Sequence, residues 1–140
     1  MSQGLVVTPT PTPTIPSVLP QKATSQPQAV QAFPWHANEI VYDGAQLCGD
    51  QREPDIAVDG SGNAYAIWAD CRNVNGDNNW DIYFAYCPVG GNWEANVKVN
   101  DDAGSAWQGT PSIAVDADGN AYAVWGDRRN GNDDIYFAYR

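Results

Sequence analysis

The chain contains few of the residues on which most enzymes and nucleic-acid-binding proteins depend. Its 140 residues include one histidine, and seven basic residues stand against seventeen acidic ones. The single histidine, His36, excludes histidine-based triads and histidine-rich zinc sites from the rest of the chain. A formal net charge of −10 repels phosphate backbones, so we expect no nucleic-acid partner.

Long apolar runs are also missing. No stretch of about 18 apolar residues occurs, so the sequence as given predicts no membrane-spanning helix. Residues 1–7 are too short, and lack the basic flank, to resemble a signal peptide. The remaining sequence is rich in Asn, Gly, Asp, Trp and Tyr and poor in Lys, which favours an extracellular or cell-surface location.

The first 34 residues differ in composition from the rest. They hold seven of the ten prolines and five of the six threonines, and Lys22 is their only charged residue. This composition is typical of an extended polyproline-II-like segment. We therefore predict a Pro/Thr-rich extended arm over residues 1–37 and a β-repeat domain over residues 38–140. The Thr-Pro alternation resembles O-glycosylated stalks, and the candidate O-glycosylation sites are Thr8, Thr10, Thr12 and Thr14.

The most informative feature present is an internal duplication. PDIAVDGSGNAYAIWADCRN (54–73) recurs as PSIAVDADGNAYAVWGDRRN (111–130), and DIYFAY (81–86) recurs at 134–139. Repetition at a period near 50 residues indicates stacked or radial repeat units. We place the two repeats at about 38–87 and 95–140.

Each repeat divides into strand-like runs separated by turn residues. The Asp-rich turns DGSGN and DADGN favour hairpins, because Gly and Asn tolerate positive φ. The run IYFAY is apolar on both faces, so its sheet must be covered on both faces, as in a propeller. We predict an all-β fold with two propeller-like four-stranded antiparallel blades, in which residues 97–99 and 40–42 are equivalent outermost strands.

The pattern IAVDxxGNAYxxW, followed by D-x-R-N and DIYFAY, resembles the blades of sialidase-like β-propellers and their Asp-box relatives over nearly all of residues 38–140. The resemblance implies the blade. It does not imply sialidase activity, because the Ser or Thr expected two residues before the Asp is absent. Two blades also cannot gather the arginines, the acid and the Tyr-Glu pair of such a site. We predict that the chain is not an enzyme and uses no cofactor.

Two blades do not make a complete propeller, since propellers have at least about four blades. The chain has an outermost-type strand before its first repeat and no outer strand after its last. The orphan strand and the open edge are complementary, which predicts strand donation between copies. The predicted assembly residues are Ile40, Val41, Tyr42, Ile135, Tyr136, Phe137 and Tyr139.

The leading functional hypothesis is a head-to-tail homopolymer, a structural fibre or filament subunit. If the rotation between subunits closes, the result is a homo-oligomeric ring. Two-blade fucose-binding lectins that trimerise are similar in design, so a closed-ring lectin is the second hypothesis. A third is that the chain is a fragment of a larger propeller.

Aromatic rings beside Arg and Asp suit a sugar site, with stacking on one sugar face and hydrogen bonds to hydroxyls. The candidate glycan-binding residues are Trp68, Arg72, Trp107, Trp125 and Arg129. The alternative is that each Asp-Arg pair only braces its loop. The Asp-rich turns lack the downstream Glu of an EF-hand, so we predict no metal site there.

Two cysteines occur at repeat positions that lack cysteine in the second copy. Cys48 aligns with Ser105 and Cys71 with Arg128, and this joint difference predicts a Cys48–Cys71 disulfide. Three unrelated reduced thiols are the alternative. Cys87 is left over and is either buried, free or intermolecular.

Overall fold

The computed structural model describes residues 35–44, 50–72 and 79–140. Residues Ala37–Arg140 belong to one compact unit. Within the described ranges the regular structure is entirely β, and no helix is long and apolar enough to cross a membrane. Residues 1–34 of the predicted arm, which include its candidate O-glycosylation threonines, lie outside the described residues, and so does Cys48.

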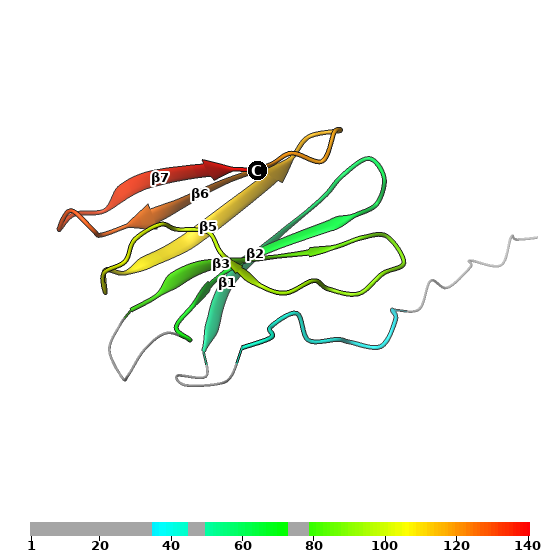
Figure 1. The fold of residues 1–140 in the computed structure, drawn as a ribbon, viewed down its shortest axis with the longest axis horizontal. Helices are drawn as coiled ribbons and strands as arrows, with labels where there is room; N and C mark the ends of the chain where they lie inside the picture. Colours follow the sequence, from blue (N-terminus) through cyan, green and yellow to red (C-terminus); the bar gives the residue numbers. More distant parts are fainter. Residues whose placement is uncertain (1–34, 45–49, 73–78) are drawn as a thin grey trace, which may run out of the picture. The chain divides into compact units, whose positions relative to one another are not determined.

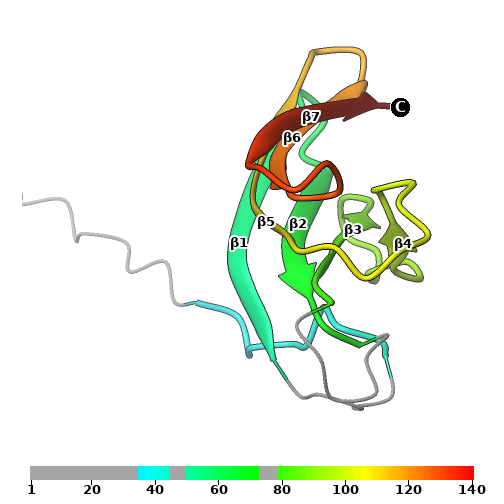
Figure 2. The ribbon, with the colours of Figure 1, turned by 90° about the vertical axis from the view of Figure 1, so that its left-hand side faces the viewer.

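The strands form two antiparallel sheets. The first has the order β1 (Gln51–Val58), β2 (Ala64–Asp70), β3 (Asp81–Cys87) and β4 (Val97–Lys98). The second has the order β5 (Gln108–Val115), β6 (Ala121–Asp127) and β7 (Asp134–Tyr139). Figure 1 shows the second sheet, in yellow to red, beside the green first sheet, and Figure 2 shows β1 to β4 in order.

The all-β prediction is confirmed, and neither sheet is closed. Four strands occur in the first sheet, but the second has three. The difference arises because the first residues of the second repeat supply β4, whereas no described segment takes the corresponding place beside β7. Residues 40–42, predicted to be equivalent to β4, form no strand.

The Asp-rich turns are hairpins held by one carboxylate each. Asp59 accepts hydrogen bonds from the backbone N–H of Ser61 and Asn63, at 2.9 and 3.0 Å. Its second oxygen accepts from the Asn63 amide at 2.7 Å and the Tyr65 hydroxyl at 2.9 Å. The second repeat reproduces these four bonds around Asp116. Local hydrogen bonding therefore accounts for the spacing that the two turns share.

Each repeat also has a bulge at the same place in its first strand. The register shifts between Arg52 and Asp55 in β1, and at the equivalent place in β5. Glu53 and Thr110 stand at these bulges with φ of 53° and 50°, a left-handed conformation that costs free energy for a residue with a side chain. The Glu53 carboxylate accepts a hydrogen bond from the Thr110 N–H, so the bulges touch where the sheets meet.

Strand register gives each sheet two faces, which we name by their residues. The Ile/Phe face carries Ile67, Ile82 and Phe84 in the first repeat. The Trp face carries Trp68, Tyr83 and Ala85. The second sheet has the equivalent faces, because Val124 pairs with Phe137 and Trp125 with Tyr136.

The core forms where the Ile/Phe face of the first sheet packs on the Trp face of the second. One cluster joins Ile67, Ala69 and Ile82 to Ala123 and Trp125. Another joins Tyr65 and Phe84 to Ala121. The remaining two faces, the Trp face of the first sheet and the Ile/Phe face of the second, have no sheet of the described residues against them.

Candidate assembly surface

The outer edge of β7 has unpaired backbone groups. Ala121 and Arg140 exchange both backbone hydrogen bonds, at 3.1 and 3.0 Å. In an antiparallel pair these bonds alternate along the strand, so the N–H and C=O groups of Ile135, Phe137 and Tyr139 point away from β6. No strand of the described residues pairs with that side of β7.

The first sheet shows how the equivalent groups are satisfied. The Tyr86 carbonyl accepts from the Glu94 N–H, and the Ile82 carbonyl accepts from the Val99 N–H, both at 2.8 Å. The Ile82 N–H donates to the Asn100 side-chain oxygen at 2.7 Å. A short segment that includes β4 therefore completes β3, and among the described residues β7 lacks the counterpart of that segment.

The side chains beside this edge are exposed although their repeat counterparts form the core. Ile135 is 78 % exposed and Phe137 57 %, whereas the equivalent Ile82 and Phe84 are 0 % and 6 % exposed. Val124 on β6 is likewise exposed. The structure thus places three predicted assembly residues, Ile135, Phe137 and Tyr139, at one open edge and on one open face. Tyr136 points to the opposite face and packs against the core.

The other predicted assembly segment, residues 40–42, lies on the Trp face of its own first sheet. Val41 packs against the cluster of Trp68, Tyr83 and Ala85. The next residue, Tyr42, has its hydroxyl buried without a hydrogen-bond partner among the described residues.

Asp43 fastens the segment by polar contacts that the sequence did not signal. The backbone N–H of Asn96 donates to the Asp43 carboxylate at 2.7 Å, and the Asp43 N–H donates to the Asn96 side-chain oxygen at 2.9 Å. The Asn96 amide also donates to the Val41 carbonyl at 2.9 Å. Arg72 forms an ion pair with Asp43 at 2.8 Å. Partners so distant in sequence have no local pattern that could have revealed them.

The candidate glycan-binding residues of the first repeat are held inside a hydrogen-bonded unit. Trp68 is 5 % exposed, and its indole N–H donates to the buried Asp70 carboxylate at 2.9 Å. The guanidinium of Arg72 donates to the same oxygen at 2.8 Å and lies over the Tyr83 ring, 3.9 Å from its centroid. These contacts brace the loop that follows β2.

The second repeat repeats the arrangement. Trp125 is buried and donates to Asp127 at 3.2 Å, and the Arg129 guanidinium donates to Asp127 at 2.7 Å. Burial alone would raise the pKa of Asp127, but the hydrogen bonds from Arg129, Trp125 and Gln108 outweigh it and lower the pKa to about 2. The hydrogen bonds that Arg129 donates to Asp127 and to Asp101 raise the pKa of Arg129. Trp107, half-buried, has the Arg128 guanidinium over its ring at 4.7 Å. The faces proposed for sugar stacking are therefore buried or covered by a guanidinium.

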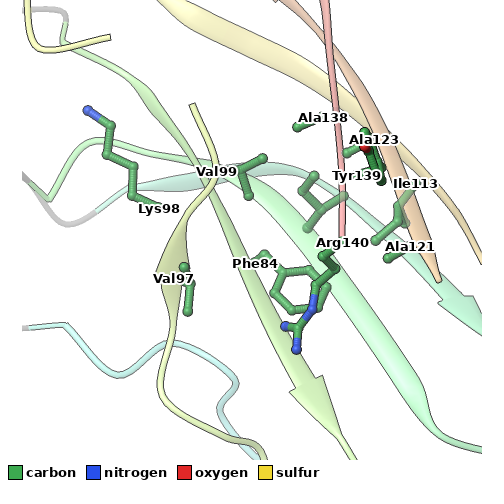
Figure 3. Close-up of a pocket in the computed structure, with 11 residues that line it drawn as sticks. Phe84, Val97, Lys98, Val99, Ile113, Ala121, Ala123, Ala138, Tyr139 and Arg140 are labelled. Atoms are coloured by element: carbon green, nitrogen blue, oxygen red, sulfur yellow. The ribbon is translucent and has the colours of Figure 1, made fainter. Parts of the chain in front are cut away.

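A cleft of about 190 Å³ lies between the two sheets at the β4 side (Figure 3). Its lining is apolar except for Lys98 and Arg140. The Lys98 ammonium is ion-paired with Asp81 at 2.6 Å, and the Arg140 guanidinium lies over the Phe84 ring at 5.1 Å. The cleft supplies packing surface, and its two cations already have partners. Nowhere in the described residues do three or more His, Cys, Asp or Glu residues gather in a way that could hold a metal ion.

The cysteines have different states. Cys71 is buried and disulfide-bonded, and Cys87 is a half-buried free thiol. Cys48, the predicted partner of Cys71, lies outside the described residues.

Comparison of the chain with family models, with curated proteins and with solved structures finds no match.

Proposed function

We propose that the chain is a non-enzymatic, extracellular or cell-surface structural subunit that assembles head-to-tail with other copies into a filament. One observation carries the proposal. The same Ile occupies the same repeat position at residues 82 and 135, but it is 0 % exposed in the first sheet and 78 % in the second. A repeat whose second copy exposes what the first copy buries lacks one neighbour.

We interpret the two sheets as consecutive propeller-like blades. In the first sheet, β4, which stands at the start of the second repeat, completes β3 of the preceding repeat. Residues 40–42 stand at the start of the first repeat in the same way, so they are suited to complete β7 of another copy by strand donation. Asp43, equivalent to Asn100, would then offer an oxygen to the Ile135 N–H as Asn100 does to Ile82.

Donation has a cost, because the segment must leave its own sheet. Its departure breaks the ion pair of Asp43 with Arg72 and the hydrogen bonds with Asn96. The Arg72 side chain is 12 % and the Asp43 side chain 43 % exposed, so this ion pair is partly buried and its loss costs more than that of a pair in open solvent. In the proposed exchange, pairing of residues 40–42 with the open edge of β7 and burial of the exposed apolar side chains beside it offset this cost.

Electron microscopy of the purified full chain and of two truncations tests the function. Removing residues 1–34 leaves the donated strand in place, whereas removing residues 1–43 deletes it. We expect filaments from the full chain and none from the chain that lacks residues 1–43. Filaments from both truncations would contradict strand donation, and a monomeric full chain would contradict assembly altogether. Discrete rings would favour the lectin hypothesis, which a glycan array would then examine.

A further inference from the structure

The Ile/Phe face of the second sheet is an exposed apolar face that no sheet of the described residues covers. Three of its side chains, Val124, Ile135 and Phe137, are between 41 % and 78 % exposed, and they lie together by strand register. We propose that this face is the docking surface for the Trp face of the first sheet of a second copy. The proposal rests on the assembly proposed above and specifies its interface.

The molecule itself contains a template for this contact. Within one chain, Ile113 and Trp125 of the second Trp face pack against Ile67 and Ile82 of the first Ile/Phe face. Val115, also on the second Trp face, packs against the cluster that contains Phe84. Within the chain, the Trp face of one repeat therefore already covers the Ile/Phe face of the other.

Both partners of the proposed contact preserve the chemistry of the template. On the receiving face the repeat exchanges Tyr65, Ile67, Ile82 and Phe84 for Tyr122, Val124, Ile135 and Phe137. Among these four the one change, from Ile to Val, removes one methylene group, and Ala69 on the same face is replaced by Gly126, so the receiving face of the second sheet is slightly smaller.

On the docking face, Ile113 and Val115 correspond to Ile56 and Val58. Ile56 is 59 % and Val58 58 % exposed, although both are apolar and lie in regular strand. Trp125 corresponds to Trp68. The second copy thus carries, on its own first sheet, the same apolar groups that the template uses.

Residues 37–44 occupy part of the docking face. Val41 and Trp93 cover Trp68 and Tyr83, whereas the equivalent Trp125 and Tyr136 are packed against the first sheet. Val41 therefore lies where a neighbouring sheet would lie. Strand donation would carry this segment to β7 of the other copy, so the movement that completes one edge also removes Val41 from the face that docks, while Trp93 stays beside it.

The new junction differs from the template in its polar contacts. Within the chain, Asp55 accepts hydrogen bonds from the Ile113 N–H at 2.9 Å and the Ser112 hydroxyl at 3.0 Å across the junction. Between copies the position of Asp55 is taken by Ser112, and that of Glu53 by Thr110. The backbone N–H groups of the docking sheet therefore meet hydroxyls where the template offers carboxylates, while Asp55 of the second copy faces Ser112 and is suited to accept from its hydroxyl. The contact between copies thus has fewer charge-assisted bonds than the one within a chain.

Two full-length variants test the proposal by sedimentation velocity. Val124→Asp with Phe137→Asp blocks the receiving face, and Ile56→Asp with Val58→Asp blocks the docking face. Each substitution places a charge in the apolar junction, which weakens association more than about 100-fold. We expect each variant alone to remain monomeric. An equal mixture forms a heterodimer that does not grow, because one receiving face and one docking face remain intact.

The matched control is Val89→Asp, which adds the same charge at an apolar residue that is 68 % exposed in the turn after β3. It should assemble like the unaltered chain. The urea midpoints of all variants should match that of the control, and Ile135→Lys replaces the receiving-face variant if that variant unfolds.

The outcomes separate the interface from the function. Normal growth of either blocked variant overturns the proposed interface and leaves the proposed assembly standing. A mixture that stays monomeric while the unaltered chain grows also overturns the interface. An unaltered chain that is itself monomeric overturns both.

Discussion

Substitution of the buried carboxylate of Asp127 gives the sharpest test of how the second sheet is held together. Asp127 is fully buried and accepts hydrogen bonds from Trp125, from Gln108 and from three nitrogens of Arg129. In Asp127→Asn one oxygen becomes an NH₂ group, which faces a guanidinium that needs an acceptor. The side chain keeps its size, so the change removes charge and acceptor capacity without opening a cavity.

The expected loss of stability follows from the bonds affected. A hydrogen bond to a charged group contributes about 1.5–3 kcal/mol, and an unpaired buried charge costs about 3–5 kcal/mol. Arg129 keeps its second ion pair with Asp101 and is 19 % exposed, so water can partly satisfy it. We expect the free energy of unfolding to fall by about 3 kcal/mol.

Urea unfolding followed by tryptophan fluorescence measures this effect, since Trp125 donates to the altered group. The matched control is Asp133→Asn. That carboxylate is 62 % exposed and pairs with Arg128, which is 55 % exposed, so the same chemical change should leave the urea midpoint unaltered. Equal midpoints for the two variants would refute the view that the Trp-Asp-Arg unit supports the fold.

The same carboxylate predicts the response to acid. Its pKa is lowered from 3.8 to about 2 in the folded chain, so the folded state favours the ionised form. The contribution to stability is therefore complete above about pH 4 and is lost as pH falls through about 2. Unfolding free energy measured against pH should decline in that window, and Asp127→Asn should decline less than the unaltered chain.

Three further predictions follow from local geometry. Thr110→Gly should raise the free energy of unfolding by about 1 kcal/mol, because glycine removes the strain of a φ near 50°, whereas Ser112→Gly in the same strand should lower it. Asp43→Asn removes the ion pair with Arg72 but keeps a side-chain acceptor, as Asn100 has in the first sheet. Light scattering should therefore detect assembly of this variant at a lower protein concentration than that of the unaltered chain. Assembly at an unchanged or higher concentration would argue that the ion pair does not hold residues 40–42 back. Calcium should leave the melting temperature unaltered, because both oxygens of Asp59 are already used by its own turn, and a rise would indicate a metal site.

Much of the fold could be predicted because its signals are local. Gly and Asn at fixed places marked the hairpins, and the second copy of the motif confirmed the boundaries of each run. Apolar residues on both faces of DIYFAY indicated a sheet that is covered on both faces. Ile82 and Phe84 are buried on one face of the first sheet, against the second sheet, but no sheet of the described residues covers the opposite face, and Ile135 and Phe137 are exposed.

The site was predicted less completely. The pattern selected Trp68 and Trp125 as exposed sugar platforms, but the structure buries both rings and engages their N–H groups with carboxylates. Glycan binding stays a prediction, as does strand donation by residues 40–42. The contacts of Asp43 with Asn96 and Arg72 could not be foreseen, because they depend on how three separated segments meet.

The sequence by itself determined the repeat, its strands and its turns, since each depends on residues within a few positions of one another. It also determined that two equivalent sheets would carry equivalent apolar faces. Only the tertiary structure decided which faces meet, because the two copies of the motif are chemically alike and either face is suited to burial. By packing the first Ile/Phe face on the second Trp face, the fold leaves Ile135 and Phe137 in solvent and Val41 over Trp68.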